Sequence, residues 1–175
     1  KVINQNLNTE SKGVKDGYDT SGYGNVTSFD SDGFTVGLTA GNNYAYNYGS
    51  GAKYLAWNWK AGGAPTTDNL VAAGGTPTAG SVKINGANLG SALAGTIAAT
   101  RLSASTTAGF SIATYTGNNT AEATIAHGLS QRPDLVIIKD RENGSTQWVH
   151  NPIGALGSNY YGYFTTGTFT ADTSN

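Results

Sequence analysis

The residues that could carry acid–base or metal chemistry are few in this chain and far apart. It has two histidines, His127 and His150, three glutamates and no cysteine. A histidine that acts as a base needs a carboxylate or hydroxyl partner within hydrogen-bond reach. Neither a G-x-S-x-G nor an H-E-x-x-H pattern surrounds either histidine. The sequence therefore predicts no enzyme activity, no bound metal ion and no cofactor.

His127 lies in a stretch that is typical of a turn leading into a strand. In TIAHGLSQRPDLVIIK, Gly128 is suited to a positive φ and Pro133 to a fixed turn exit. The aliphatic run at 135–138 is typical of a strand that is buried on both faces. We therefore expect the His127 imidazole to bridge a loop carbonyl and the end of this strand, and to have no catalytic role.

The acidic residues do not form a recognisable site either. Glycoside hydrolysis needs two carboxylates that face each other across a cleft. Glu10, Glu122 and Glu142 each lie in loop-type sequence without aromatic residues nearby, so a hydrolase is the weakest alternative. Four aspartates could gather a calcium ion, but their spacing does not fit a calcium-binding helix–loop–helix. They are Asp16, Asp19, Asp30 and Asp32.

Aromatic side chains beside small polar residues are the candidate binding residues. In YLAWNWK, residues 54–60, strand alternation places Trp57 and Trp59 on one face, where they could stack on a sugar ring or fill a core. The stretches 42–51 and 158–164 combine tyrosine with asparagine, serine and glycine, as binding surfaces do. A core role is favoured for Trp57 and Trp59 and ordinary strand packing for the tyrosines, whereas both roles stay open for Trp148, which has polar neighbours. The predicted glycan contacts are Trp57, Trp59, Trp148, Tyr46, Tyr160 and Tyr161.

The composition excludes several classes of partner. Of the 175 residues, 12% are charged, about half the usual share, and the net charge is −1. Because no segment concentrates positive charge, we expect no nucleic acid partner. No apolar run reaches the length that spans a bilayer, so we expect no membrane insertion. The chain does not begin with methionine, and we expect it to be a segment of a longer protein.

Short β-branched and aromatic runs between turn residues predict an all-β fold, an antiparallel β-sandwich of jelly-roll or concanavalin A-like type. Residues 26–29 and 34–36 flank DSDG, which predicts a hairpin. A helix over 88–102 is disfavoured because it would contain Gly90 and Gly95. Further strands are expected at 54–59, 81–84, 110–115, 123–126, 135–139, 147–150 and 160–164.

The composition also suggests a division into three parts. Residues 1–60 would form part of a sandwich, and residues 102–175 a second β-sandwich module. Between them, 61–101 is rich in glycine, alanine and threonine, and its first twenty residues have almost no large side chain. We expect this segment to be a linker or an extended arm, because it offers little apolar area to offset the entropy of ordering.

Several phrases in fixed order resemble a tandem-module segment of large virion structural proteins from tailed phages, notably marine ones. They are FDSDGFTVG, YLAWNWKAGG, SASTTAGFSIATYTG, ATIAHGLSQRPDLVIIKDR and WVHNP, and the resemblance covers most of residues 26–165. It implies that the first phrases close a concanavalin A-like sandwich and that the later ones open a further all-β module. It also implies a virion location, as a tail fibre, tail-associated or capsid decoration protein that could contact host surface glycans.

The predicted function is therefore that of a non-enzymatic structural protein of a phage particle. Its expected partners are other copies of itself in a homo-oligomer, other virion proteins and a host cell-surface glycan. Two alternatives remain open: a glycan-binding, lectin-like module of a bacterial surface or secreted protein, and a subunit of an extracellular filament.

Overall fold

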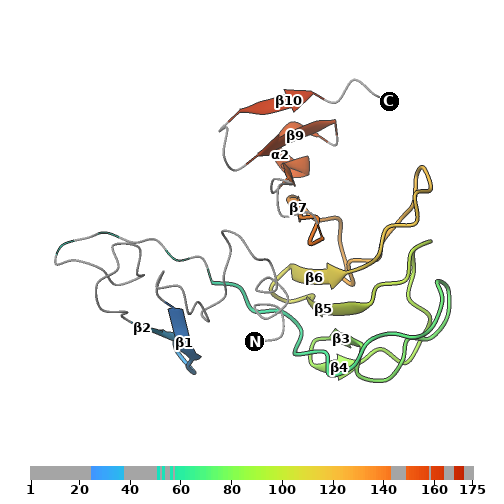
Figure 1. Cartoon of the computed structure of the whole chain (residues 1–175), viewed down its shortest axis with the longest axis horizontal. Coiled ribbons are helices and arrows are strands. Elements are labelled where there is room, and N and C mark those ends of the chain that lie inside the picture. Colours follow the sequence, from blue (N-terminus) through green and yellow to red (C-terminus); the bar gives the residue numbers. More distant parts are fainter. Residues whose placement is uncertain are drawn as a thin grey trace. The chain divides into compact units, whose positions relative to one another are not determined.

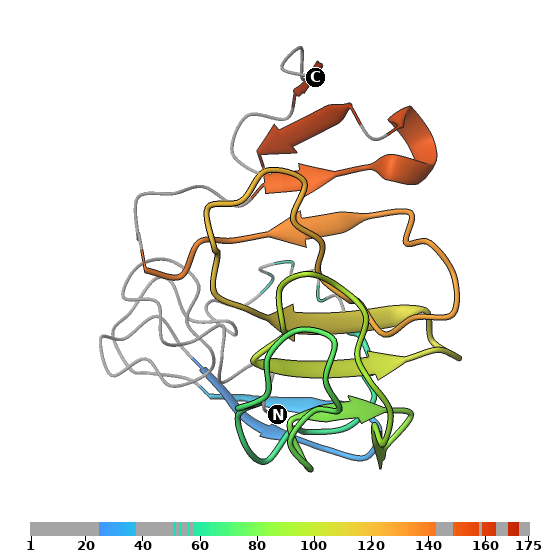
Figure 2. The same cartoon turned by 90° about the vertical axis from the view of Figure 1, so that its right-hand side faces the viewer.

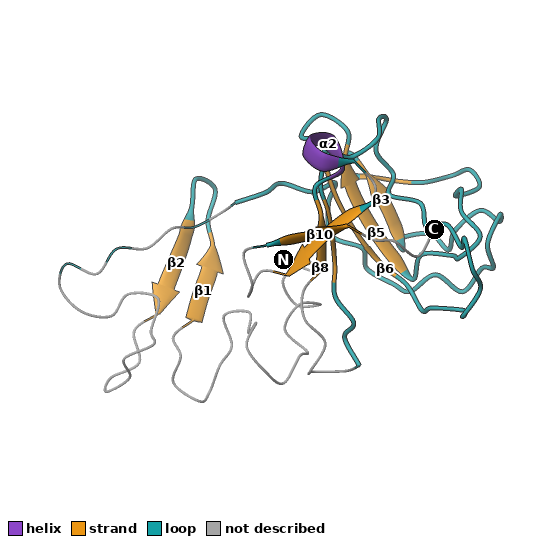
Figure 3. Cartoon of the chain, turned by 90° about the horizontal axis from the view of Figure 1, so that it is seen from above, coloured by secondary structure: helices purple, strands orange, loops and turns teal. Residues whose placement is uncertain are grey.

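The computed structural model describes residues 25–37, 51, 53, 56, 58–142, 149–157, 159–163 and 168–171. In this part of the chain the regular structure is almost entirely β, with one helix of four residues, α2 (Ile153–Leu156) (Figure 3). The predicted all-β class is confirmed, whereas the jelly-roll strand order stays a prediction. No helix among the described residues is long and apolar enough to cross a membrane.

The chain forms two compact units. The continuous unit is Trp57–Arg132, and the split unit combines Ile3–Ala56 with Pro133–Asn175. These units divide the chain differently from the predicted boundaries after residues 60 and 101. Residues 61–101 lie inside the continuous unit, together with the first part of the predicted second module.

The continuous unit contains a four-stranded sheet in the order β4-β3-β5-β6 (Figure 1). The β3–β4 and β5–β6 pairs are antiparallel, whereas β3 and β5 run parallel. A parallel pair needs a long connection, which residues 85–100, including β4, supply without a helix. Figure 2 shows the strands of this sheet as neighbouring arrows. The strands are β3 (Val82–Ile84), β4 (Ala87–Asn88), β5 (Arg101–Ser105) and β6 (Phe110–Thr114).

A two-residue turn joins β3 to β4. Asn85 and Gly86 have φ angles of 51° and 90°, and Ile84 pairs with Ala87 across the turn. An Asn-Gly pair with two positive φ angles is the preferred chemistry of a two-residue hairpin, because its twist matches that of the strands. The Asn85 side chain also donates to the Thr106 hydroxyl at 2.7 Å and accepts from the Thr106 N–H at 2.9 Å. This turn is therefore tied to the one that follows β5.

The core of the continuous unit centres on β5, where Leu102, Ser103 and Ala104 are all buried. Successive side chains in a strand point to opposite faces, so both faces of β5 are covered. Residues 88–102 contain no helix, as predicted. This segment supplies Leu93 to the core. The buried apolar residues are Val82, Leu93, Ala99, Leu102 and Ala104.

The expected linker is packed structure in the described residues, which corrects the prediction for 61–101. The Gly86 N–H donates to the Gly62 carbonyl at 2.6 Å, and the Ser103 hydroxyl donates to the Gly63 carbonyl. A Cβ at Gly62 would overlap the backbone of Ala104. The small residues therefore allow the main chain to lie directly against the sheet, and backbone hydrogen bonds replace the side-chain burial that the composition lacks.

The predicted hairpin at DSDG is confirmed. Strands β1 (Asn25–Phe29) and β2 (Phe34–Gly37) pair antiparallel across it. The Asp30 carboxylate accepts from the hydroxyls of Ser28 and Thr35 at 2.8 and 2.9 Å, and its N–H donates to the Gly33 carbonyl at 2.9 Å. Asp30 therefore acts as a turn residue that hydrogen-bonds its own hairpin.

The split unit also contains an antiparallel four-stranded sheet in the order β10-β9-β8-β7. The prediction that the aliphatic run 135–138 is buried on both faces is wrong, because Ile137 and Ile138 are 41% and 45% exposed. β7 is an end strand of this sheet in the described part of the chain, and a sequence run does not reveal such a position. The strands are β7 (Val136–Ile138), β8 (Val149–Asn151), β9 (Tyr160–Tyr163) and β10 (Phe169–Ala171).

Candidate functional site

His127 stabilises its own loop. Its Nδ1 accepts a hydrogen bond from the Leu129 N–H at 3.0 Å, so the partner is an N–H and not the loop carbonyl that the sequence suggested. Gly128 has the predicted positive φ, at 69°. A Cβ there would lie 2.8 Å from Leu102 Cδ2, in contact with the core. The close approach of this loop to β5 therefore requires glycine.

His150 packs in a sheet of the split unit. Its ring meets the Phe169 ring edge-on, with centroids 5.1 Å apart. Gly162 on β9 pairs in register with both residues, on β8 and β10. The two rings thus flank the glycine from either side, an arrangement that covers a backbone with no side chain of its own. His150 therefore has a clear structural role.

Among the described residues, no three acidic or histidine side chains lie close enough together to hold a metal ion. The Asp68 carboxylate instead pairs with the Arg101 guanidinium at the surface of the continuous unit.

Among the predicted glycan contacts that the structure describes, Trp59 is the most exposed. Its side chain is 61% exposed, and its ring stacks on Phe110 of β6 with centroids 5.4 Å apart and an interplanar angle of 8°. Phe110 was expected only as a strand residue. The indole is therefore held against the sheet while much of its surface faces solvent.

Two of the other predicted contacts, Tyr160 and Tyr161, lie in the split unit. Tyr160 and Tyr161 are neighbours on β9, so they point to opposite faces of their sheet. Tyr160 is exposed, whereas Tyr161 is partly buried and packs edge-on against Tyr163. Both belong to the split unit, and Trp59 belongs to the continuous unit. Trp57, Trp148 and Tyr46 lie outside the described residues.

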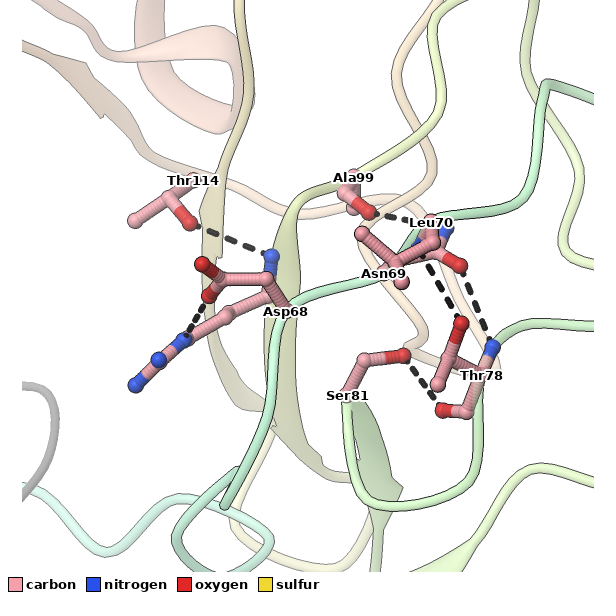
Figure 4. Close-up of polar contacts among 8 residues, drawn as sticks. Asp68, Asn69, Leu70, Thr78, Ser81, Ala99 and Thr114 are labelled. Atoms are coloured by element: carbon pink, nitrogen blue, oxygen red, sulfur yellow. Dashed lines mark hydrogen bonds and ion pairs between the residues drawn. The ribbon is translucent and has the colours of Figure 1, made fainter.

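A loop that the sequence did not single out begins at Asn69 and is held by a network of hydrogen bonds. The Asn69 amide uses both donors and both acceptor positions, and Figure 4 shows its bonds to Ala99 and Thr78. It donates to the carbonyls of Ala99 and Val71 at 3.1 and 3.3 Å and accepts from the N–H groups of Val71 and Thr78, each at 3.1 Å. The Asn69 N–H donates to the Thr100 carbonyl at 2.8 Å.

Thr78 and Ser81 extend this network to β3. The Thr78 hydroxyl accepts from the Leu70 N–H at 3.0 Å, and the Ser81 hydroxyl donates to the Thr78 carbonyl at 2.6 Å (Figure 4). Ser81 is fully buried. Both ends of the loop 69–78 are therefore fixed to the core of the continuous unit. We call it the Asn69 loop.

The Asn69 loop presents apolar side chains to solvent. Leu70 is 86% exposed, and Val71 and the alanines at 72 and 73 are exposed as well. The sequence signal for this loop was DNLVAAGG, an asparagine before an apolar run that ends in glycines. This pattern predicts a turn, but it does not reveal the hydrogen bond to Ala99 that holds the loop in place.

The comparisons with known proteins place the chain in one family. A family model described as "Domain of unknown function (DUF7483)" matches residues 2–173. The chain belongs to this family. No curated protein and no solved structure shows a significant match. The DUF7483 match covers nearly all of both compact units, so one family domain includes the continuous unit and the two parts of the split unit.

Proposed function

We propose that this DUF7483 chain is a non-enzymatic structural component of a phage virion, in a tail fibre, a tail-associated protein or a capsid decoration. It assembles with other copies of itself and contacts other virion proteins. The virion location rests on the ordered phrases that resemble virion proteins of tailed phages.

The observation that carries the assembly part of the proposal is the exposure of apolar side chains on a surface with few charges. Leu70 with Val71, and Leu135 with Ile137 and Ile138, form two exposed runs along the chain. Only 12% of the residues are charged. Adjacent exposed apolar residues typically mark interaction surfaces, and charged residues are depleted in the cores of protein interfaces. Such surfaces suit a protein that works in contact with others.

Immunogold electron microscopy tests the location. An antibody raised against the expressed chain is applied to purified phage particles whose genome encodes it, and to the host bacteria. The proposal predicts gold at a fixed position on the particles. Gold on uninfected bacterial surfaces, with none on particles, would contradict it and favour a bacterial surface protein.

Glycan binding is a second candidate function, favoured by the stacking of the exposed Trp59 on Phe110. An indole held flat offers an apolar face to the C–H groups of a pyranose. The parallel arrangement fixes the orientation of the ring before a ligand arrives, which lowers the entropy cost of binding. Of the glycan contacts predicted from the sequence, Trp59 is therefore the one to test first.

A glycan array with the intact chain, followed by titration of any hit, tests this second function. Binding through the platform predicts that Trp59→Ala weakens the hit by about tenfold or more. Tyr115→Ala is the matched control, because Tyr115 is an exposed aromatic residue outside the predicted set. An array without any hit, or a hit that Trp59→Ala leaves unchanged, would count against the platform.

A further inference from the structure

The Asn69 loop holds its apolar residues in a fixed position. The Leu70 N–H donates to the Thr78 hydroxyl and the Val71 N–H to the Asn69 side chain, so the backbone on which both side chains stand is hydrogen-bonded. Asn69 is bonded to Ala99 and Thr100 in turn. A surface that is already ordered loses little conformational entropy when it binds.

The exposed side chains of this loop do not serve the core of the continuous unit. Leu70 is 86% exposed, whereas the core consists of Val82, Leu93, Ala99, Leu102 and Ala104. Burial of apolar area is what stabilises a fold, and Leu70 buries almost none. The exposed apolar run of this loop can instead bury its area against a partner surface.

The charge of the surroundings indicates which partner fits. Between 69 and 100 the only charged residue is Lys83, and at the base of the loop Asp68 and Arg101 neutralise each other. A strongly charged partner finds no array of opposite charges here. A second copy brings the same nearly neutral surface, so no like-charge repulsion opposes its approach.

We propose that the Asn69 loop, with Leu70 and Val71 as its anchors, is the contact surface between copies of this chain. The proposal rests on the proposed function, in which the chain assembles with itself, and it names the surface used. The neutral surroundings provide no electrostatic steering, and the hydrogen-bonded backbone lowers the conformational entropy that is lost on contact.

Sedimentation velocity over a range of concentrations measures the assembly of the 175-residue chain. Leu70→Asp places a charge at the proposed contact, and we expect the dissociation constant to rise by about tenfold or more. Leu156→Asp is the matched control, because Leu156 is an exposed leucine of the split unit. Circular dichroism verifies that both variants are folded, which the exposure of both side chains leads us to expect.

Thiol labelling locates the contact independently. The chain has no cysteine, so the introduced thiol in Ala72→Cys is the only one to react. We expect its reaction with a maleimide to slow as the chain assembles, and Leu70→Asp in the same chain to restore it. Ala121→Cys, at an exposed turn outside the loop, is the control whose rate stays constant.

The outcomes separate this proposal from the proposed function. Assembly that resists Leu70→Asp and leaves the cysteine at position 72 reactive would overturn the assignment of the loop and leave self-assembly intact. A chain that stays monomeric at every concentration would overturn both. Protection of that cysteine in a monomeric chain only after phosphatidylcholine vesicles are added would assign the loop to a lipid surface and overturn the second-copy proposal.

Discussion

At the scale of single residues, short polar side chains hold the backbone in place by hydrogen bonds. Asn69 joins its own loop to the segment before β5, Asn85 ties two turns together, and Asp30 closes a hairpin. Only the Asp30 hairpin was predicted from the sequence, because an Asp-rich turn is a local signal, whereas the Asn85 bonds to Thr106 span 21 residues. The Asn69 bond to Ala99 spans thirty residues, and no local pattern reveals such a partner.

Asn69→Asp tests the network at its centre. The carboxylate keeps both acceptor positions, but it loses the two donors and faces the carbonyl oxygens of Val71 and Ala99. We expect the free energy of unfolding to fall by about 1–3 kcal/mol, measured by urea denaturation. Asn88→Asp adds the same charge on exposed β4 and should change it by less than about 0.5 kcal/mol. Equal effects of the two substitutions would contradict the role given to the Asn69 amide.

At the scale of elements, several strands predicted from β-branched and aromatic residues are present, but the one expected over 123–126 is reduced to isolated bridges at Ile125. A strand built from small residues was missed. β6 with FSIAT was expected, whereas β5 with RLSAS was not. Yet β5 is the strand that is covered on both faces. The small side chains of β5 allow the segment around Gly62 and Gly63 to pack closely on this strand. The position of β5 therefore depends on tertiary contacts and not on the strand propensity of its residues.

Gly62→Ala tests that close packing. Because the new Cβ would overlap the Ala104 backbone, either the strand or the segment must move. We expect a loss of about 3 kcal/mol or more, which in a unit of this size lowers the Tm by about 12 °C or more. Gly90→Ala is the control, since nothing lies within 4 Å of its added Cβ. If calorimetry finds the same Tm for both variants, the segment does not pack on β5 as described.

At the scale of the whole molecule, the sequence predicted the all-β class but not the division of the chain. A stretch poor in large side chains looks like a linker when burial is judged by side chains alone. In the described residues that stretch belongs to the continuous unit, where hydrogen bonds of Gly62, Thr66 and Asn69 fix it. The parallel pairing of β3 with β5 was equally hidden, because it depends on residues that are twenty apart.

Native mass spectrometry of the unmodified chain tests whether this protein assembles with itself through its sparsely charged surfaces. Spectra recorded over a concentration series are predicted to show masses that are multiples of 18.0 kDa, with the larger species increasing as concentration rises. A single species at 18.0 kDa at every concentration would contradict the claim.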